Sequence, residues 1–355
     1  MTKIVLIGAG SVSFGPGTLC DLFAARQELA GSTIALVDTD PEALRTMAQL
    51  AQRMNRATGK PFIIEATPDR REALPGAQFV IIAVAVRRNE RWRLDFQIPL
   101  KHGVKQVLGE NGGPGGLNHF TWVLDLRHKH TGEDLYPAFR RAMAEKCIEE
   151  VSTNGYSYGV KLCHYLMDTF GYWPSPSDDH VGEYLSYAWE YCGLEGYDFD
   201  AVDRATEEGW RRLRHLASGE EPVDELLQHR SGEIAVPIIV GVLDNTHQYE
   251  LAVNVPNAGF IPNLPSWAIV EVPATVDATG VHGVTVGPLP EPIAAMCHTQ
   301  IAIIDRMVEA AVGGDRRAAL QALLLDPLVN GISQAEAILD EMLAVHRDFL
   351  PQFYS

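Results

Sequence analysis

Apolar and polar positions along the first 90 residues alternate in blocks that predict strands and helices in turn. Continuous apolar runs predict buried strands at 3–7, 33–37, 62–64 and 78–86, because a strand covered on both faces has no polar alternation. Helical spacing of apolar residues predicts helices between them at 18–30, 42–57 and 70–74. Strands alternating with helices indicate an α/β fold, a Rossmann-like doubly wound parallel sheet with helices on both faces.

A glycine-rich stretch at 109–116 ends this alternation, since it holds too many glycines for a helix or a strand. Beyond it the pattern is mixed. Predicted helices lie at 133–150, 182–195, 203–216, 287–312, 316–325 and 332–345, and predicted strands at 234–243 and 267–272. We therefore expect a domain at 1–116 and a C-terminal α+β substrate domain at 117–355, the two-domain arrangement of lactate and malate dehydrogenases.

Composition narrows the class of protein. The chain has 355 residues, the length of about two domains. Its formal net charge of −17 disfavours nucleic-acid binding, because an acidic surface repels a phosphate backbone. No apolar stretch approaches the ~18 residues that a membrane span needs, so we expect a cytoplasmic protein. The five cysteines are an odd, widely spaced set and predict small buried side chains, without a disulfide framework.

The turn after the first predicted strand carries a dinucleotide-binding pattern. Gly8 and Gly10 lie between a buried strand and a helix, where glycines let the backbone approach a pyrophosphate. Asp38 ends the second strand, where a carboxylate can accept hydrogen bonds from ribose hydroxyls and repel a 2′-phosphate. Ser13 and Phe14 occupy the region of the usual third glycine. NAD is the expected cofactor, and the alternative is a tight turn that binds none.

Four phrases in the sequence have no purely structural reason for their composition. They are the glycine-rich stretch 109–116, Leu-Asn-His-Phe at 117–120, Ser-Pro-Ser-Asp-Asp-His-Val-Gly-Glu-Tyr at 175–184, and the Asn- and Pro-rich segment 254–273. With the opening Gly-Ala-Gly-Ser-x-x-Phe, they resemble the family 4 glycoside hydrolases, glycosidases that depend on NAD and a divalent metal. The resemblance covers nearly the whole chain and looks closest to the branch acting on α-galactosides and α-hexuronides.

This resemblance implies hydrolysis of an α-glycosidic bond by oxidation, elimination and addition. NAD takes a hydride from C3 of the sugar, which acidifies the C2 proton. A divalent metal, with Mn²⁺ as the preferred ion, stabilises the charge that develops. His119 matches the metal-binding histidine. Asn118 and Asn263 are expected at the substrate, a small carbohydrate. The residues expected at NAD are Gly8, Gly10, Ser11, Phe14, Asp38 and Asn111.

The densest group of titratable residues lies at 178–184. Asp179, His180, Glu183 and Tyr184 are the candidate catalytic residues, and the His, Glu and Tyr side chains among them can carry the proton of the C2 step. If Ser177 or Asp179 caps a helix, His180 lies one turn from Glu183 and Tyr184. The alternative is a helix start with Asp178 and Asp179 in its first turn, which needs no catalytic role.

The chain departs from the family pattern at Gly116, which is followed directly by Leu117. The family has there a segment on the order of 30 residues or more, which holds a Cys whose thiolate is the second protein ligand of the metal. Leu162-Cys163-His164 has a similar composition but lies on a predicted helix ending at Phe170, which we interpret as coincidence. A sheet without an interior strand must close up or expose an edge.

Three hypotheses about function follow from this departure. The chain could be a family glycosidase whose lost ligand is replaced. It could be an NAD-dependent dehydrogenase of a small hydroxy compound. It could be a catalytically impaired NAD-binding remnant. Two further expectations are a homodimer or homotetramer formed by the apolar helices of 301–350, and a substrate carboxylate at Arg87, Arg88, Arg91 and Arg93, for which a solvated basic turn is the alternative.

Overall fold

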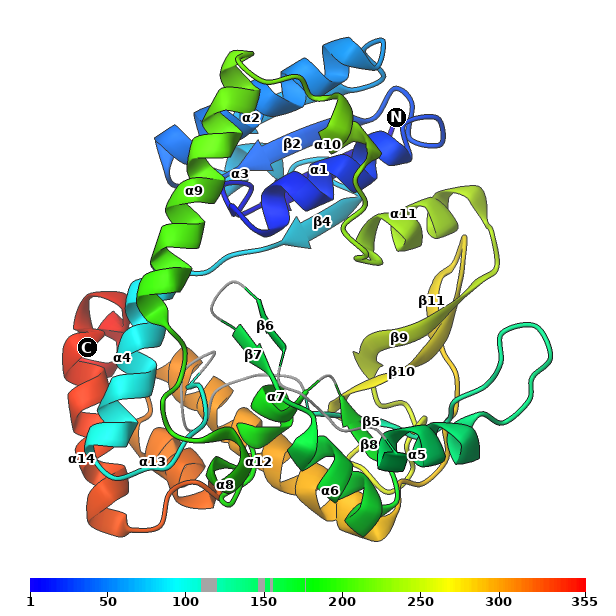
Figure 1. Cartoon of the computed structure of the whole chain (residues 1–355). Helices are drawn as coiled ribbons and strands as arrows, with labels where there is room; N and C mark the ends of the chain where they lie inside the picture. The colour runs from blue at the N-terminus through cyan, green and yellow to red at the C-terminus, as the bar shows by residue number, and fades with distance from the viewer. Residues whose placement is uncertain (110–119, 146–150, 154–155, 176) are drawn as a thin grey trace. The chain divides into compact units, whose positions relative to one another are not determined.

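The computed structural model describes residues 1–109, 120–145, 151–153, 156–175 and 177–355 (Figure 1). It contains two compact units. The first unit comprises Met1–Val86, Asp203–Val255 and Val272–Thr285, and the second comprises Arg87–Val202, Pro256–Glu271 and Val286–Ser355. These bounds differ from the division expected at residue 116, because the chain leaves the first unit at Val86 and returns to it at Asp203. The domain division stays a prediction.

The first unit is built on a parallel sheet, as the sequence predicts. Its strands are β1 (Lys3–Ile7), β2 (Thr33–Val37), β3 (Ile63–Thr67) and β4 (Phe79–Ile82), in the order β3-β2-β1-β4. Every neighbouring pair is parallel, with Val5 opposite both Ala35 and Val80. This is the strand order of the first half of a doubly wound sheet, in which the carboxyl end of β1 faces the ligand.

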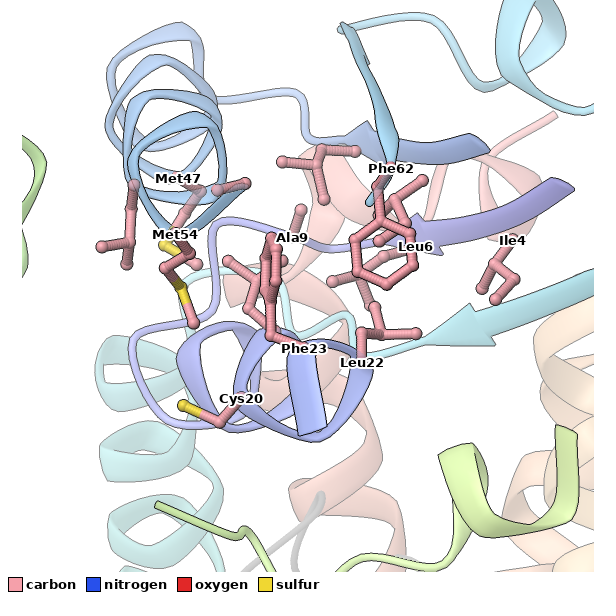
Figure 2. Packing of buried hydrophobic residues seen from close by; sticks show 14 of the residues in the cluster. Ile4, Leu6, Ala9, Cys20, Leu22, Phe23, Met47, Met54 and Phe62 are labelled. Atoms are coloured by element: carbon pink, nitrogen blue, oxygen red, sulfur yellow. The ribbon is translucent and has the colours of Figure 1, made fainter. Parts of the chain in front are cut away.

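The core of this unit lies between the sheet and the helices α1 (Phe14–Ala24) and α2 (Pro41–Ala57). Figure 2 shows side chains of both helices pointing toward those of the strands. Phe23 meets Phe62 edge to face at 5.1 Å between ring centroids. The helix α2 begins where the Asp40 carboxylate accepts hydrogen bonds from the N–H groups of Glu42 and Ala43. Residues of α9 (Phe199–Ser218) and α11 (Ala235–Asp244) complete this core.

The opposite face of the sheet has a smaller cover. Val5, Ala35 and Val37 pack there against Ala73 of α3 (Arg70–Ala73). The strand β4 lies at one end of the sheet and pairs with β1 alone among the described strands. The Val80 and Ile82 side chains of β4 are 43% and 66% exposed. An open edge with exposed apolar side chains is one of the two outcomes expected of a sheet that lacks an interior strand.

The second unit consists mainly of helices. Its helices are α4 (Arg88–Lys101), α5 (Tyr136–Glu145), α6 (Lys161–Phe170), α7 (Asp178–Gly182), α8 (Trp189–Cys192), α12 (Glu291–Gly313), α13 (Arg316–Leu325) and α14 (Ile332–Val345). Two short antiparallel pairs join β5 (Thr121–Val123) to β8 (Trp173–Ser175) and β6 (Val151–Thr153) to β7 (Tyr156–Tyr158). The C-terminal helices close around a core that includes Ala310, Leu323 and Leu339. Two 3₁₀ turns, Arg347–Phe349 and Pro351–Phe353, end the chain.

The remaining elements are α10 (Asp224–Gln228) and an antiparallel sheet. That sheet has the order β11-β10-β9, from β9 (Gln248–Pro256), β10 (Ile269–Asp277) and β11 (Gly280–Gly283). Within the described residues, no helix is both long and apolar enough to cross a membrane.

Two predicted elements are wrong. The apolar run 234–243 is the helix α11, not a strand, because it is long enough for three helical turns and buries Val236 and Ile239 on one face. The range 182–195, predicted as one helix, begins at the last residue of α7 and otherwise holds only the short helix α8, with turns between the two. The helix predicted at 133–150 is described as α5, and its last five residues lie outside the described part.

The helix α1 packs unusually close to the turn before it, and Gly15 permits this. A Cβ at Gly15 would lie 2.4 Å from the Ala9 carbonyl oxygen and 2.9 Å from Cε of Met47. In a dinucleotide-binding turn, the third glycine allows the helix to pack closely on the strand. Ser13 and Phe14 occupy its usual region here, and Gly15 takes its role.

We predict that Gly15→Ala lowers the free energy of unfolding by about 1–3 kcal/mol, because the added methyl must displace backbone. Gly313→Ala is the matched control, since a Cβ there meets no atom within 4 Å, and it should stabilise the helix α12 by up to about 1 kcal/mol. Urea denaturation of both variants measures the difference. Equal unfolding midpoints for the two variants would contradict the packing role of Gly15.

Candidate active site

The turn between β1 and α1 brings five of the expected cofactor residues together. Gly8 has φ +85°, and a Cβ on it would lie 2.1 Å from the Ala83 carbonyl oxygen. The Gly10 N–H donates to Oδ2 of Asp38 at 2.7 Å. The Ser11 hydroxyl accepts a hydrogen bond from the Phe14 N–H at 3.1 Å. Hydrogen bonds among its own residues and with Asp38 therefore fix the turn. Because Gly8 has no Cβ, the backbone of Ala83 can pack directly against it. Asn111 lies outside the described residues.

Asp38 has both carboxylate oxygens in use by backbone donors and still retains acceptor capacity. Its Oδ1 accepts from the Asp40 N–H at 2.9 Å, and its Oδ2 accepts from Gly10. A carboxylate oxygen has two lone pairs, so each oxygen can also accept a hydroxyl hydrogen. The arrangement suits a ribose diol and disfavours a phosphate.

The residues Asp178 to Tyr184 are brought together around α7, but their contacts differ. Asp178 is 4% exposed, and its carboxylate accepts hydrogen bonds from the N–H groups of Leu162 at 3.0 Å and Cys163 at 2.8 Å. It thereby caps the first turn of α6. Burial raises the pKa of Asp178 against the opposing effect of these hydrogen bonds. Asp178 lies in the first turn of α7, as the alternative from the sequence has it, but its carboxylate caps α6.

Asp179 and His180 form a hydrogen-bonded pair. Nδ1 of His180 lies 3.0 Å from Oδ1 of Asp179, which also accepts from the His180 N–H and from the Ser177 hydroxyl. Burial of Asp179 acts to raise its pKa, but the hydrogen bonds from His180 and Ser177 outweigh it, so its pKa lies below the usual value. A carboxylate at Nδ1 orients the imidazole ring, an arrangement also found in general-base histidines.

Glu183 and Tyr184 contact the residues on either side of segment 110–119. Oε1 of Glu183 accepts hydrogen bonds from the N–H groups of Leu108 at 2.7 Å and Gly109 at 3.2 Å. The Tyr184 side chain is 7% exposed, and its ring centroid lies 4.8 Å from that of Phe120. The α7 region therefore fixes both flanks of the segment that carries Asn118 and His119. This positioning role was missed from the sequence, and the proton-carrier role stays a prediction.

The expected metal and substrate residues are only partly described. His119 and Asn118 lie outside the described residues. Asn263 exchanges hydrogen bonds with the backbone of Leu289, at 2.9 Å in each direction, and its substrate role stays a prediction. Within the described part of the chain, no group of three His, Cys, Asp or Glu side chains could hold a metal ion.

The motif Leu162-Cys163-His164 has the surroundings of a core segment. Cys163 is fully buried, and burial raises its thiol pKa, with the nearby Asp178 carboxylate adding to the effect. Nδ1 of His164 lies 3.7 Å from the Asp168 carboxylate. The interpretation of the motif as a coincidence stays a prediction.

The arginines of α4 are occupied by protein partners. Arg91 lies 3.1 Å from the Val345 carbonyl oxygen and 4.4 Å above the ring of Phe349. Arg93 pairs with the Asp200 carboxylate at 3.0 Å. Their contacts tie α4 to neighbouring segments of the second unit.

The low pKa of Asp179 predicts how its contribution to stability depends on pH. The contribution is fully present above the unfolded-state pKa near 3.9 and is lost as pH falls through the folded-state value. Asp179→Asn should therefore cost about 1–3 kcal/mol of unfolding free energy at pH 7 and at pH 5, and progressively less below about pH 4. Denaturation across this range tests it beside Asp168→Asn, whose side chain is 62% exposed. If the loss of unfolding free energy in Asp179→Asn grew as the pH fell, the lowered pKa of Asp179 would be contradicted.

Models of two protein families match the chain. The family 4 glycosyl hydrolase model matches residues 3–123, and the model of the family 4 glycosyl hydrolase C-terminal domain matches residues 115–329. The two matches meet in the region of segment 110–119, where the sequence departs from the family pattern.

Curated relatives align along nearly the whole chain. An α-glucosidase from Erwinia rhapontici is 32% identical over 98% of this chain and 99% of its own length. An α-galactosidase from Bacillus subtilis (strain 168) is 25% identical over 99% of this chain and 100% of its own. The first alignment runs over 462 positions, whereas this chain has 355 residues, so the relative holds on the order of 100 positions that this chain lacks.

Solved structures share the fold. A 6-phospho-α-glucosidase from gut microorganisms, in complex with NAD and Mn²⁺, has a TM-score of 0.81 at 18% identity, with 99% of each chain covered. A putative glucosidase from Bacillus subtilis, lplD, has a TM-score of 0.82 at 22% identity, with 97% of this chain and 100% of its own covered. From the matches of both family models and the relative at 32% identity, the chain belongs to glycosyl hydrolase family 4.

Proposed function

We propose that the protein binds NAD and hydrolyses the α-glycosidic bond of a small α-galactoside or α-hexuronide, with a divalent metal, Mn²⁺ preferred. The observation that carries the proposal is the turn in which Gly8, Gly10 and Asp38 meet at the end of β1. Support for the substrate class comes from family relatives named α-galactosidase and α-galacturonidase. Another relative is named a probable 6-phospho-β-glucosidase, so the branch must be tested by assay.

The residues of the β1–α1 turn fit the cofactor. Gly8 and Gly10 let the turn pack closely on Ala83 and Asp38, and the backbone N–H groups at the start of α1 would hold a pyrophosphate while the Asp38 carboxylate would accept ribose hydroxyls. When bound, NAD supplies a hydride acceptor for the sugar C3–H and returns the hydride after the bond is broken. Relatives of known structure contain NAD and Mn²⁺ or NAD and glucose 6-phosphate.

The Asp179–His180 pair is the proposed base for the C2 proton. Asp178 and Glu183 accept hydrogen bonds from backbone N–H groups, which supports a positioning role for both, and the proton-carrier role of Glu183 stays a prediction. The 3.0 Å hydrogen bond from Nδ1 of His180 to Asp179 orients the ring and stabilises its protonated form. His180 would accept the C2 proton, and the Asp179 carboxylate would then stabilise the positive charge on the imidazole ring.

His119 is the proposed metal ligand, and the metal would polarise the sugar oxygens. A second candidate function, NAD binding with little or no glycosidase turnover, is favoured by one observation. The Erwinia relative holds on the order of 100 positions that this chain lacks, and the family pattern places a metal-binding thiolate in such a segment. A site without that thiolate loses charge neutralisation and divalent affinity.

Self-association is part of the proposal. Exposed apolar side chains gather on the C-terminal helices: Val308 at 51%, Val312 at 80%, Leu325 at 46% and Ile332 at 68%. These exposed apolar residues support the proposal of an interface, which a symmetric dimer, or a tetramer built from dimers, would cover.

We predict that Asp38→Ala weakens NAD binding at least about 10-fold, because a hydrogen bond to a charged group contributes about 1.5–3 kcal/mol. Titration calorimetry measures it. Asp69→Ala is the matched control, since the Asp69 carboxylate caps α3 and accepts from the Arg71 N–H. Asp38→Asn keeps an acceptor for the turn and should narrow the preference for NAD over NADP. Equal affinity of the wild type for NADP would contradict the ribose assignment.

We predict NAD- and Mn²⁺-dependent release of nitrophenol from α-galactoside or α-galacturonide substrates, assayed with reductant. His119→Ala should reduce the rate by roughly 100-fold or more, because loss of even outer groups around a metal costs 10–100-fold. Turnover of β-linked substrates alone would overturn the branch assignment. Steady accumulation of NADH without aglycone release would identify a dehydrogenase instead, and turnover that survives His119→Ala would place the metal elsewhere.

A further inference from the structure

An open cavity of about 420 Å³ lies wholly within the second unit, where three segments of the chain meet. These segments are the turn after β5, the start of α5 and the turn between α6 and β8, elements that Figure 1 labels. Among the described residues that line the cavity, none is expected at NAD, at the metal, at the substrate or at the C2 proton. The cavity is therefore a feature to which the proposed reaction gives no role.

The base of the cavity is a buried tyrosine that ties the three segments together. Tyr136 is 8% exposed, and its hydroxyl donates to the Val123 carbonyl oxygen at 2.6 Å and accepts from the Trp173 N–H at 2.7 Å. The Arg140 guanidinium lies 5.2 Å from the centroid of the Tyr136 ring and donates to the Gly171 carbonyl oxygen. Because these contacts join all three segments, the cavity is formed before any ligand arrives.

The wall of the cavity carries a second tyrosine. Gly171 ends α6 with φ +87°, a conformation that glycine adopts without strain, and Tyr172 follows it directly. The Tyr172 side chain is partly buried and meets the Tyr136 ring edge to face, at 6.1 Å between centroids. Leu124 and Pro137 also line the cavity. An aromatic ring and two aliphatic side chains thus give it an apolar surface.

Two carboxylates of the cavity are each anchored through one oxygen. Oδ2 of Asp125 pairs with Nε of Arg127 at 2.8 Å, and Oδ1 of Asp134 accepts from the Tyr136 N–H at 2.9 Å, at the start of α5. Between described residues, the other oxygen of each carboxylate and the Tyr172 hydroxyl make no hydrogen bond. These atoms can accept hydrogen bonds from the hydroxyl groups of a ligand.

The charges at the cavity balance, which favours an uncharged ligand. The carboxylates of Asp125 and Asp134 are matched by the guanidinium groups of Arg127 and Arg140. A ligand that suits the whole set is neutral, donates several hydroxyl hydrogens and has an apolar face for an aromatic ring. A pyranose sugar has this combination, because its C–H groups gather on a face of the ring and its hydroxyl groups lie around the edge.

We propose that this cavity binds a neutral pyranose sugar, with the Tyr172 ring against the apolar face of the sugar and the carboxylates of Asp125 and Asp134 accepting its hydroxyl groups. The inference goes beyond the proposed function, because the cavity needs neither NAD nor a metal ion and uses none of the residues assigned to the reaction. Its ligand has the chemistry of an uncharged glycoside or of the sugar released from one. The site would hold such a molecule at the protein independently of turnover.

The test follows binding on the full chain by saturation-transfer NMR, without NAD or divalent metal. The probes are methyl α-galactoside and methyl α-glucoside, and glycerol is the open-chain control. The wild type should transfer saturation to the ring C–H protons of the sugars and not to glycerol. Tyr172→Ala should weaken sugar binding about 10-fold, because the aromatic contact is lost. Asp134→Asn should weaken it about 3-fold, because a neutral acceptor binds a hydroxyl less strongly, while it keeps the cap of α5.

Tyr165→Ala is the matched control variant, since this tyrosine of α6 is 50% exposed and does not line the cavity. It should bind the sugars as the wild type does. Circular dichroism confirms that each variant is folded. Sugar binding that is unchanged in both Tyr172→Ala and Asp134→Asn would overturn the assignment. A wild type that binds neither sugar at tens of millimolar, or that binds glycerol equally well, would also overturn it.

A further variant separates this site from the proposed active site. His119→Ala should bind both sugars as the wild type does, because His119 is the proposed metal ligand and the assay contains no metal. Loss of sugar binding in His119→Ala would place the observed binding at the proposed metal site and overturn the cavity assignment. Failure of the glycosidase assay would count against the proposed function alone, since the sugar-binding result does not depend on turnover.

Discussion

Carboxylates that accept hydrogen bonds from backbone N–H groups fix the candidate functional segments within each unit. Asp38 fixes the cofactor turn through Gly10, and Asp21 of α1 fixes the segment before α11 through Ser231. In the second unit, Asp178 caps α6, and Glu183 binds the backbone just before segment 110–119. A hydrogen bond to a charged acceptor contributes about 1.5–3 kcal/mol and also fixes direction. Each of these hydrogen bonds joins two segments that are separated along the chain. Some of the many acidic residues therefore hold loops in place.

The sequence predicted those features that depend on neighbouring residues. The strands at 3–7 and 33–37, the turn at Gly8 and the acid at Asp38 follow one another at short range, and the structure has them in that arrangement. Family motifs carried the prediction further, to the glycosidase family that the family models confirm. The helix α11 was missed because a ten-residue apolar run fits a buried strand as well as a helix.

Contacts between distant segments could not be predicted from the pattern. The hydrogen bond from Leu108 to Glu183 spans 75 residues, and the bond from Ser231 to Asp21 spans 210. Neither Glu183 nor Asp21 has a local signal that separates an anchoring carboxylate from a catalytic or solvated one. Gly15 was missed because the packing at Ala9 and Met47 that requires it is visible only in three dimensions.

The segment that this chain lacks relative to its family affects the two proposed binding sites differently. The cofactor turn lies on the first two strands, before the departure from the family pattern, and its residues are complete. The open edge of β4, with Ile82 66% exposed, is where a further strand of a doubly wound sheet would pair. The first unit thus keeps the residues of the cofactor turn, whereas the proposed metal site rests on His119.

The central claim is that NAD takes part in breaking the glycosidic bond through removal of the C2 proton. Turnover in D₂O with NAD and Mn²⁺, followed by mass spectrometry and NMR of the sugar product, tests it even at a low rate. The account predicts one carbon-bound deuterium in the product, at C2, because the proton that the base removes is replaced from solvent. A hydrolysed sugar with no carbon-bound deuterium would contradict the account and indicate direct displacement at C1.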